Sequence, residues 1–428
     1  MAGARVTAVD DTPRAQPTAA EIRVRGGMRK RLILLGPAFV AAIAYVDPGN
    51  FATNFSAGAE FGYLLVWVIV VANVLAMLIQ TLSAKLGLAT GRNLPELCRD
   101  HFPRAVTRGM WVQAELVAIA TDLAEVIGGA IALNLLFGIP VFAGGVITGI
   151  VAFGLLGLQS RGFRPFERAI TGLFAVILTG FLVTLLRVDL VPGDAIAGLV
   201  PRFEGTDSLL LATGILGATV MPHVIYLHSA LTQNRVSADS VVDRRFLFRH
   251  QQIDVFLAMG LAGIINLSML LISAALFFGT DIPGTDTLEG VHAGLARVLD
   301  QPAAFLFALA LLASGFASSG VGTYAGQVVM QGFIRRSIPL MLRRGLTMAP
   351  ALLVLAIGLD PTRALVFSQV VLSFGIPFAL VPLVLLTRRV DIMGELVNRR
   401  LTTAVAALAA AMIIVLNAFL IIRTIAGT

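Results

Sequence analysis

Long apolar runs alternate with short polar segments along almost the whole chain. A helix needs about 20 apolar residues to cross the hydrocarbon core of a bilayer. Eleven runs have that length or come near it, at residues 32–56, 62–87, 109–136, 141–160, 167–188, 208–231, 252–278, 303–333, 346–359, 364–386 and 402–425. The pattern predicts an all-α membrane protein whose eleven helices form a single transmembrane domain over residues 28–428.

Composition and charge placement agree with this prediction. The chain is 57% hydrophobic and 13% charged, which would leave a water-soluble domain covered in apolar surface. When loops are assigned alternately to the two sides, all but six of the 32 lysines and arginines share the side of the N-terminus. Lys85 lies within the second run, and the opposite side holds Arg187, Arg202, Arg297, Arg363 and Arg423. By the positive-inside rule, the N-terminus is cytoplasmic and Thr428 is external.

The net charge of +7 does not indicate a nucleic-acid partner. The basic residues lie in loops between apolar runs, without the interleaved aromatic residues on which bases stack. Residues 1–27 are polar and show no signal-peptide pattern, so we expect a disordered cytoplasmic tail. Cys98 is the only cysteine, which excludes an internal disulfide and a thiolate-rich metal cage.

The first apolar run is interrupted by a carboxylate and a helix-breaking pair, Asp47-Pro48-Gly49. A carboxylate near the bilayer centre costs on the order of 2.5 to 3.5 kcal/mol on insertion scales. Its presence therefore calls for a partner. The sixth run repeats the pattern, with Met221-Pro222-His223 in mid-span.

Proline has no N–H and so leaves the carbonyl four residues earlier without its helical donor. The carbonyls freed by Pro48 and Pro222 belong to Ala44 and Ala218. Freed backbone at membrane depth is tolerated only where it meets a cavity, another helix or an ion. Breaks in the first and sixth helices predict two inverted five-helix repeats, with the eleventh helix as an appendage.

If the two breaks meet, they offer several donors to a metal ion. The set comprises the Asp47 carboxylate, the Asn50 amide oxygen, the Met221 thioether and the two alanine carbonyls. Calcium and magnesium prefer shells of oxygen alone, whereas a thioether favours softer ions such as manganese, iron, cobalt or cadmium. The alternative is structural, because prolines also kink membrane helices and methionine also fills cores.

The third run carries three acids, Glu115, Asp122 and Glu125. At 100° per residue they form one stripe along about 15 Å of helix. This stripe indicates either a proton relay or an ion-pair network, for which Arg343 and Arg344 are candidate partners. We interpret His223 as a proton acceptor beside the metal site, the alternative being a packed, hydrogen-bonded histidine. We expect His228 to be structural.

These motifs resemble those of the Nramp metal transporters. The matching segments are Asp47-Pro48-Gly49-Asn50, Met221-Pro222-His223 and Ala-Thr-Asp-Leu-Ala-Glu at residues 120–125. The resemblance implies a LeuT-like fold, alternating access and metal–proton symport. It implies metal ligands at Asp47, Asn50, Met221, Ala44 and Ala218, with Gln369 able to approach the ion. It also implies a proton path through Asp47, His223, Glu125, Asp122 and Glu115 toward Arg343 and Arg344.

The sequence thus predicts a monomeric transporter in the inner cell membrane that imports Mn²⁺ or Fe²⁺, and also Cd²⁺ and Co²⁺, with protons and without a cofactor. A carrier of amino acids on the same fold is an alternative, although Asp47 would repel a substrate carboxylate. A membrane enzyme is disfavoured because the sequence has no HExxH or GxSxG motif. A passive channel is the third alternative.

Overall fold

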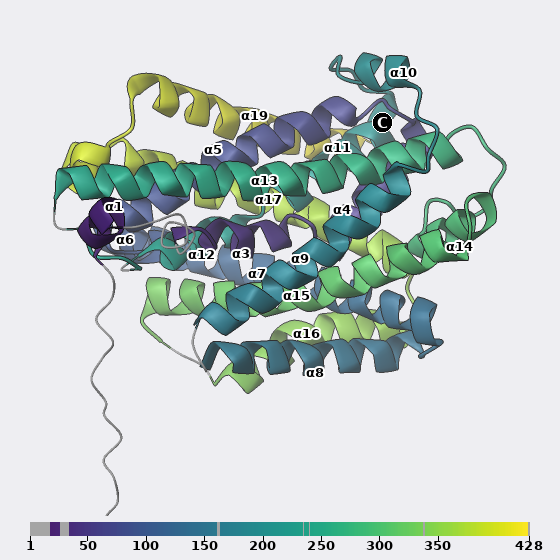
Figure 1. The fold of residues 1–428 in the computed structure, drawn as a ribbon, viewed down its shortest axis with the longest axis horizontal. Coiled ribbons are helices and arrows are strands. Elements are labelled where there is room, and N and C mark those ends of the chain that lie inside the picture. Colours follow the sequence, from purple (N-terminus) through teal and green to yellow (C-terminus); the bar gives the residue numbers. More distant parts are fainter. Residues whose placement is uncertain are drawn as a thin grey trace, which may run out of the picture.

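The computed structural model describes residues 18–25, 34–160, 163–233, 235–238, 240–336 and 339–426. Over these ranges the regular elements are helices, and the only β contact is an isolated bridge between Thr18 and Ser237. Most of the long helices run side by side along the longest axis of the molecule (Figure 1). The predicted all-α architecture is therefore confirmed.

Each predicted run corresponds to one helix or to two helices in succession. The first run forms α3 (Pro37–Ala44) and α4 (Pro48–Phe61), and the sixth forms α11 (Gly205–Thr219) and α12 (Pro222–Thr232). The others form α5 (Val66–Thr90), α7 (Arg104–Phe137), α8 (Val141–Ser160), α9 (Phe163–Leu185), α13 (Val241–Phe277), α15 (Gln301–Ile334), α16 (Leu340–Ile357), α17 (Pro361–Thr387) and α19 (Arg400–Ala426).

Eight segments of the described chain are long and apolar enough to cross a membrane, with α11 and α12 counted together. The apolar helix at Val141–Leu155 is shorter. Large apolar side chains such as Phe256 and Leu408 are 67% and 70% exposed, a surface that suits lipid and not water. The chain is thus a multi-pass membrane protein, and the number of eleven spans stays a prediction.

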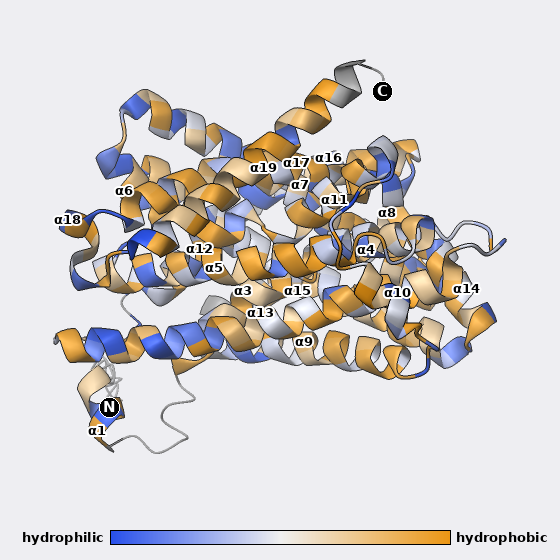
Figure 2. Ribbon diagram, turned by 90° about the horizontal axis from the view of Figure 1, so that it is seen from above, coloured by the Kyte–Doolittle hydropathy of each residue, from blue (hydrophilic) through white to orange (hydrophobic). Residues whose placement is uncertain are grey.

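Short helices connect the long ones. They are α6 (Leu94–His101), α10 (Pro192–Ala197), α14 (Leu288–Val298) and α18 (Val390–Met393), the last followed by a 3₁₀ turn at Gly394–Leu396. Figure 2 shows hydrophilic residues around α6, α18 and the start of α13, at one end of the bundle, and mostly apolar ribbon in the middle. This end carries the loops that the positive-inside rule assigns to the cytoplasm.

Part of the expected disordered tail is ordered instead. Residues 19–25 form helix α1 (Ala19–Arg25), whose Ala19 and Ile22 pack in a small apolar cluster with Leu247 of α13. Arg23 also forms a 2.9 Å ion pair with Asp243. The prediction of disorder was wrong for residues 19–25. The helix is stabilised by contacts with residues more than 200 positions away, which the pattern of the tail itself does not reveal. The rest of the tail, residues 1–17 and 26–27, lies outside the described residues.

The core surrounds the two interrupted helices. Phe51 and Phe55 of α4 form edge-to-face contacts with Phe181 of α9 and Phe307 of α15. The start of α3 is held by Asp254 of α13, whose buried carboxylate accepts the backbone N–H groups of Gly36 and Ala38. A carboxylate at a helix N-terminus is stabilised by the free N–H groups there. These contacts thus hold α3 and α4, the two halves of the first broken helix.

Candidate metal site at two helix breaks

Both breaks place a proline at the first position of the second half-helix. Asp47 is the N-cap of α4, which begins at Pro48, and Met221 is the N-cap of α12, which begins at Pro222. Proline suits this position because its missing N–H has no helical partner there and its φ is already helical. The two sequence motifs therefore mark half-helix starts, where N-terminal backbone groups face the gap.

Asn50 joins the two breaks. Its side-chain Nδ2 donates to Asp47 Oδ1 at 2.8 Å and to the carbonyl of Ala218 at 3.1 Å. Asp47 Oδ1 also accepts the backbone N–H of Asn50 at 2.9 Å. Three of the predicted ligand residues, from α4 and α11, are thus in direct contact, and Ala44 ends the half-helix that precedes Asp47.

Gln369 of α17 lies against both breaks. A Cβ atom added at Gly49 would lie 1.9 Å from Gln369 Nε2, and one added at Gly217 would lie 1.9 Å from the Gln369 carbonyl. Glycine at these two positions therefore allows α17 to approach α4 and α11 closely. The structure brings Gln369 to the predicted site, a contact that the sequence suggested only through the family resemblance.

Several buried acceptors at the breaks have no hydrogen-bond partner among the described residues. They are Asp47 Oδ2, Asn50 Oδ1, Gln369 Oε1 and Thr219 Oγ1, in side chains at most 1% exposed. Leaving a buried polar atom unpaired costs about 1 to 3 kcal/mol, and more for a charged group. Together with the buried thioether of Met221, these oxygens form a donor set that a divalent cation would satisfy. Thr219 was not predicted from the sequence.

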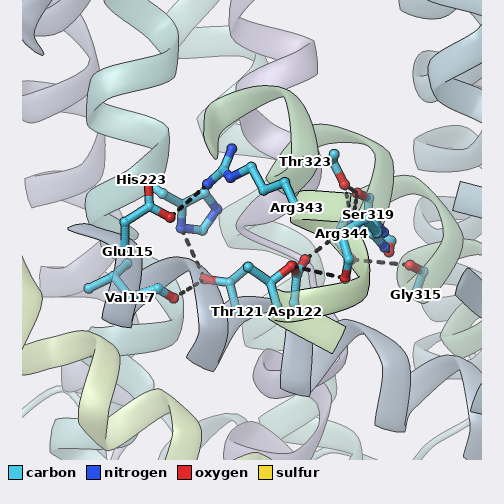
Figure 3. A network of polar contacts seen from close by, with 12 residues as sticks. Glu115, Val117, Thr121, Asp122, His223, Gly315, Ser319, Thr323, Arg343 and Arg344 are labelled. Atoms are coloured by element: carbon cyan, nitrogen blue, oxygen red, sulfur yellow. Dashed lines mark hydrogen bonds and ion pairs between the residues drawn. The ribbon is translucent and has the colours of Figure 1, made fainter. Parts of the chain in front are cut away.

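Two of the three acids on α7 form ion pairs with the predicted arginines of α16 (Figure 3). Glu115 lies 3.1 Å from Arg343, and Asp122 lies 3.1 Å from Arg344. Arg344 is 1% exposed and also donates to the backbone carbonyl of Ser319 and to the hydroxyl of Thr323, both on α15. The ion-pair interpretation of the stripe is thus confirmed for these two acids.

Glu125 differs from the other two acids. Its side chain is fully buried, and neither carboxylate oxygen has a hydrogen-bond partner among the described residues. It lies close to Gly322 of α15, where an added Cβ atom would come within 2.7 Å of Glu125 Oε1. Of the three acids, Glu125 is the one without an arginine partner in the part of the chain that the structure describes.

His223 is linked to the same helix. Its Nδ1 lies 3.2 Å from the hydroxyl of Thr121, which itself donates to the carbonyl of Val117 at 3.0 Å (Figure 3). In the tautomer whose Nδ1 donates to that hydroxyl, the lone pair lies on Nε2. Nε2 is buried and has no partner among the described residues. His228 Nδ1 donates to the side-chain oxygen of Gln80 at 2.8 Å, and its Nε2 is likewise buried with no partner among the described residues.

Comparison with known proteins places the chain among transporters. Residues 38–423 match the family described as natural resistance-associated macrophage protein-like. A divalent metal cation transporter MntH of Deinococcus radiodurans is 53% identical over 403 residues, which cover 94% of this chain and 92% of that protein. The MntH of Bacillus subtilis is 51% identical over 423 residues, which cover 98% of each chain.

Solved structures support the same family assignment as the sequence relatives. Those of the Eremococcus coleocola manganese transporter match with a TM-score of 0.82 and 34% identity, over 91% of this chain and 86% of that one. The nucleobase-cation-symport-1 family transporter Mhp1 matches with a TM-score of 0.63 over 90% of each chain, but at 15% identity, so it supports the fold alone. The fold is the predicted LeuT-like one, with the first and sixth helices broken. From the extent and identity of these matches, the chain belongs to the natural resistance-associated macrophage protein family, the Nramp transporters.

Proposed function

We propose that this protein imports divalent transition-metal ions, Mn²⁺ or Fe²⁺ and also Cd²⁺ and Co²⁺, in symport with protons by alternating access. The relatives named as divalent metal cation transporters and as a manganese transporter support the substrate class. We further propose that it works as a monomer in the inner cell membrane. Family membership makes it a transporter and not an enzyme.

The observation that carries the proposal is the set of unpaired oxygens at the two breaks. Asp47 Oδ2 and Asn50 Oδ1 are buried without partners, although Asp47 Oδ1 and Asn50 Nδ2 are bonded to one another. The arrangement leaves one anionic and one neutral oxygen for a cation, with the Met221 thioether and the carbonyls of Ala44 and Ala218 as further ligands. A single carboxylate gives modest affinity, which suits a carrier that must release its ion.

The proton half of the proposal rests on α7. Glu125 and His223 Nε2 are buried and unpaired, while Asp122 and Glu115 are held by Arg344 and Arg343. A proton released from Asp47 or His223 would pass to Glu125 and then along the ion pairs toward Arg343. The metal and the proton would therefore leave the centre by different routes, the proton along α7.

Alternating access would use the half-helices. Pro48 and Pro222 uncouple α3 from α4 and α11 from α12, so each half can tilt without breaking helical hydrogen bonds in the other. Gln369 of α17 contacts both breaks and would follow the ion. Entry of a divalent ion down 100 mV supplies about 4.6 kcal/mol, and proton coupling would add to it.

The test is Mn²⁺ uptake into proteoliposomes that contain a pH-sensitive dye, under an imposed proton gradient. We expect uptake and internal acidification in the unmodified protein, and loss of both in Asp47→Ala. Asp243→Asn is the matched control, because Asp243 pairs with Arg23 on α1, away from the breaks, and both signals should persist.

Three outcomes would point to the other functions. Movement of radiolabelled amino acids without Mn²⁺ would identify an organic-solute carrier on the same fold. Metal currents that are ohmic and independent of the pH gradient would identify a channel. Uptake of Mn²⁺ without acidification would support metal transport but contradict its proposed coupling to protons.

A further inference from the structure

Thr219 is the last residue of α11, and its hydroxyl is unpaired. The side chain is 1% exposed, and among the buried threonine hydroxyls that the structure describes only Thr219 Oγ1 has no partner. A buried hydroxyl normally finds a hydrogen-bond partner, so each exception needs an explanation.

The other helical threonines show the usual solution. Twelve of them donate to the backbone carbonyl four residues earlier. Thr213, on the same helix as Thr219, does so to Leu209 at 2.8 Å. This back-bond is the default for threonine inside a helix. Thr219 has a helical residue, Ile215, in the same relative position and makes no such bond.

Several residues close to Thr219 in the chain contribute to the candidate metal site or pack against it. The carbonyl of Ala218 accepts the Asn50 side chain at 3.1 Å. Gly217 packs against the backbone of Gln369, and Met221 follows two residues later as the N-cap of α12. Thr219 thus stands in the chain between two proposed ligand residues, Ala218 and Met221, with a buried hydroxyl that its own helix does not use.

We propose that Thr219 is a specificity-determining residue of the metal site, supplying a neutral hydroxyl oxygen to the transported ion or to a water molecule that the ion retains. The inference rests on the proposed function and deepens it. Oxygen donors favour harder divalent ions and sulfur donors favour softer ones. Thr219 therefore shifts the site toward Mn²⁺, while Met221, on the other side of Val220, shifts it toward Cd²⁺.

The experiment measures competitive uptake of Mn²⁺ and Cd²⁺ into proteoliposomes by the full-length protein. Thr219→Val keeps the shape of the side chain and removes the hydroxyl. We expect it to lower the uptake efficiency for Mn²⁺ roughly tenfold, as for a lost contact to a charged group, and to change that for Cd²⁺ much less. Thr219→Ser should restore the ratio. Thr213→Val is the matched control, because its hydroxyl only back-bonds, and the ratio should stay at the wild-type value.

Thr219→Cys gives a second measurement that does not depend on losing activity. A thiol in place of the hydroxyl should raise the preference for Cd²⁺ above that of the wild type. An unchanged ratio of Mn²⁺ to Cd²⁺ uptake in both Thr219→Val and Thr219→Cys overturns the inference and leaves the proposed function intact. If the wild type moves neither ion, the proposed function itself is overturned.

Discussion

Met221 supplies the only sulfur among the proposed ligands, so its removal tests the choice of metal. We expect Met221→Ala to weaken Cd²⁺ binding more than Mn²⁺ binding and to admit more Ca²⁺ or Mg²⁺, because the ligands that remain are all oxygen. The measurement is uptake of each ion, alone and in competition. Met330→Ala is the control, since Met330 is a buried methionine near the end of α15. Unchanged selectivity in Met221→Ala would remove this residue from the site.

The pair of Asp122 and Arg344 is buried on both sides, at 5% and 1% exposure. Asp122→Asn leaves the guanidinium without its counter-charge, and breaking such a pair from one side costs about 3 to 5 kcal/mol. We expect a clear fall in the thermal unfolding temperature in detergent. The double variant Asp122→Asn with Arg344→Met should regain much of the loss, because neither member of the pair is then charged.

An exposed pair is the control for this experiment. Arg363, 84% exposed at its side chain, pairs with Asp360 at 3.5 Å, and Arg363→Met should change stability little. A double variant at Asp122 and Arg344 that is no more stable than Asp122→Asn would show that the charge pairing is not what stabilises this region.

At the level of single residues, the sequence identified charged side chains whose placement in a membrane costs free energy. Asp47, Glu115 and Asp122 were identified because a carboxylate in an apolar run needs a partner, and the partners Arg343 and Arg344 followed from the same argument. Thr219 was missed because the hydroxyl of a threonine in a helix normally donates to a backbone carbonyl of the same helix. Only the structure shows that the Thr219 hydroxyl makes no such bond. The difference among the three acids could be seen only in the structure, where, among the described residues, Glu115 and Asp122 form ion pairs and Glu125 does not.

Glycines set how closely α17 approaches the broken helices, and two of them have different neighbours. A Cβ atom at Gly49 would meet the end of the Gln369 side chain, whereas one at Gly217 would meet the backbone of Gln369 and Ser373. A side chain can move aside and a helix backbone cannot. We expect Gly49→Ala to fold normally but to displace Gln369 and slow Mn²⁺ uptake, and Gly217→Ala to destabilise the fold.

Gly172 of α9 is the control for both substitutions, because an added Cβ atom there has nothing within 4 Å. Gly172→Ala should stabilise the helix slightly, by up to about 1 kcal/mol. Thermal unfolding and uptake are measured for all three variants. Equal melting temperatures for Gly217→Ala and Gly172→Ala would contradict the packing argument.

Among the helices, the breaks were the most predictable feature. Pro48 and Pro222 each begin a half-helix, as proline geometry requires. Helix α1 was not predictable, because its seven residues are held by Leu247 and Asp243 and not by their own pattern. The eleventh helix, α19, is more than an appendage, since Asn417 accepts from the Ser373 hydroxyl at 2.7 Å and donates to its carbonyl at 2.9 Å. Such long-range polar contacts leave no signal in a single sequence.

At the scale of the whole molecule, the fold class followed from the alternation of apolar runs with polar segments and from the proline breaks in two of these runs. The predicted orientation in the membrane rests on the distribution of basic residues alone. Two exposed positions at opposite ends test it. Gly193 in α10 is predicted to be external, and Arg388 after α17 is predicted to be cytoplasmic. The single native cysteine, Cys98, is buried, so the unmodified protein should stay unlabelled by a membrane-impermeant maleimide.

In intact cells we expect Gly193→Cys to react with this reagent and Arg388→Cys to react only after the membrane is permeabilised. The physical reason is that positively charged loops are retained on the cytoplasmic side, whereas the loop that contains Gly193 carries few basic residues. Import also depends on this orientation, because an inward-negative potential drives a divalent cation only toward the side where Arg388 lies. The reverse labelling pattern would show that the orientation in the membrane is opposite to the predicted one. The proposed proton path along α7 would then lead out of the cell.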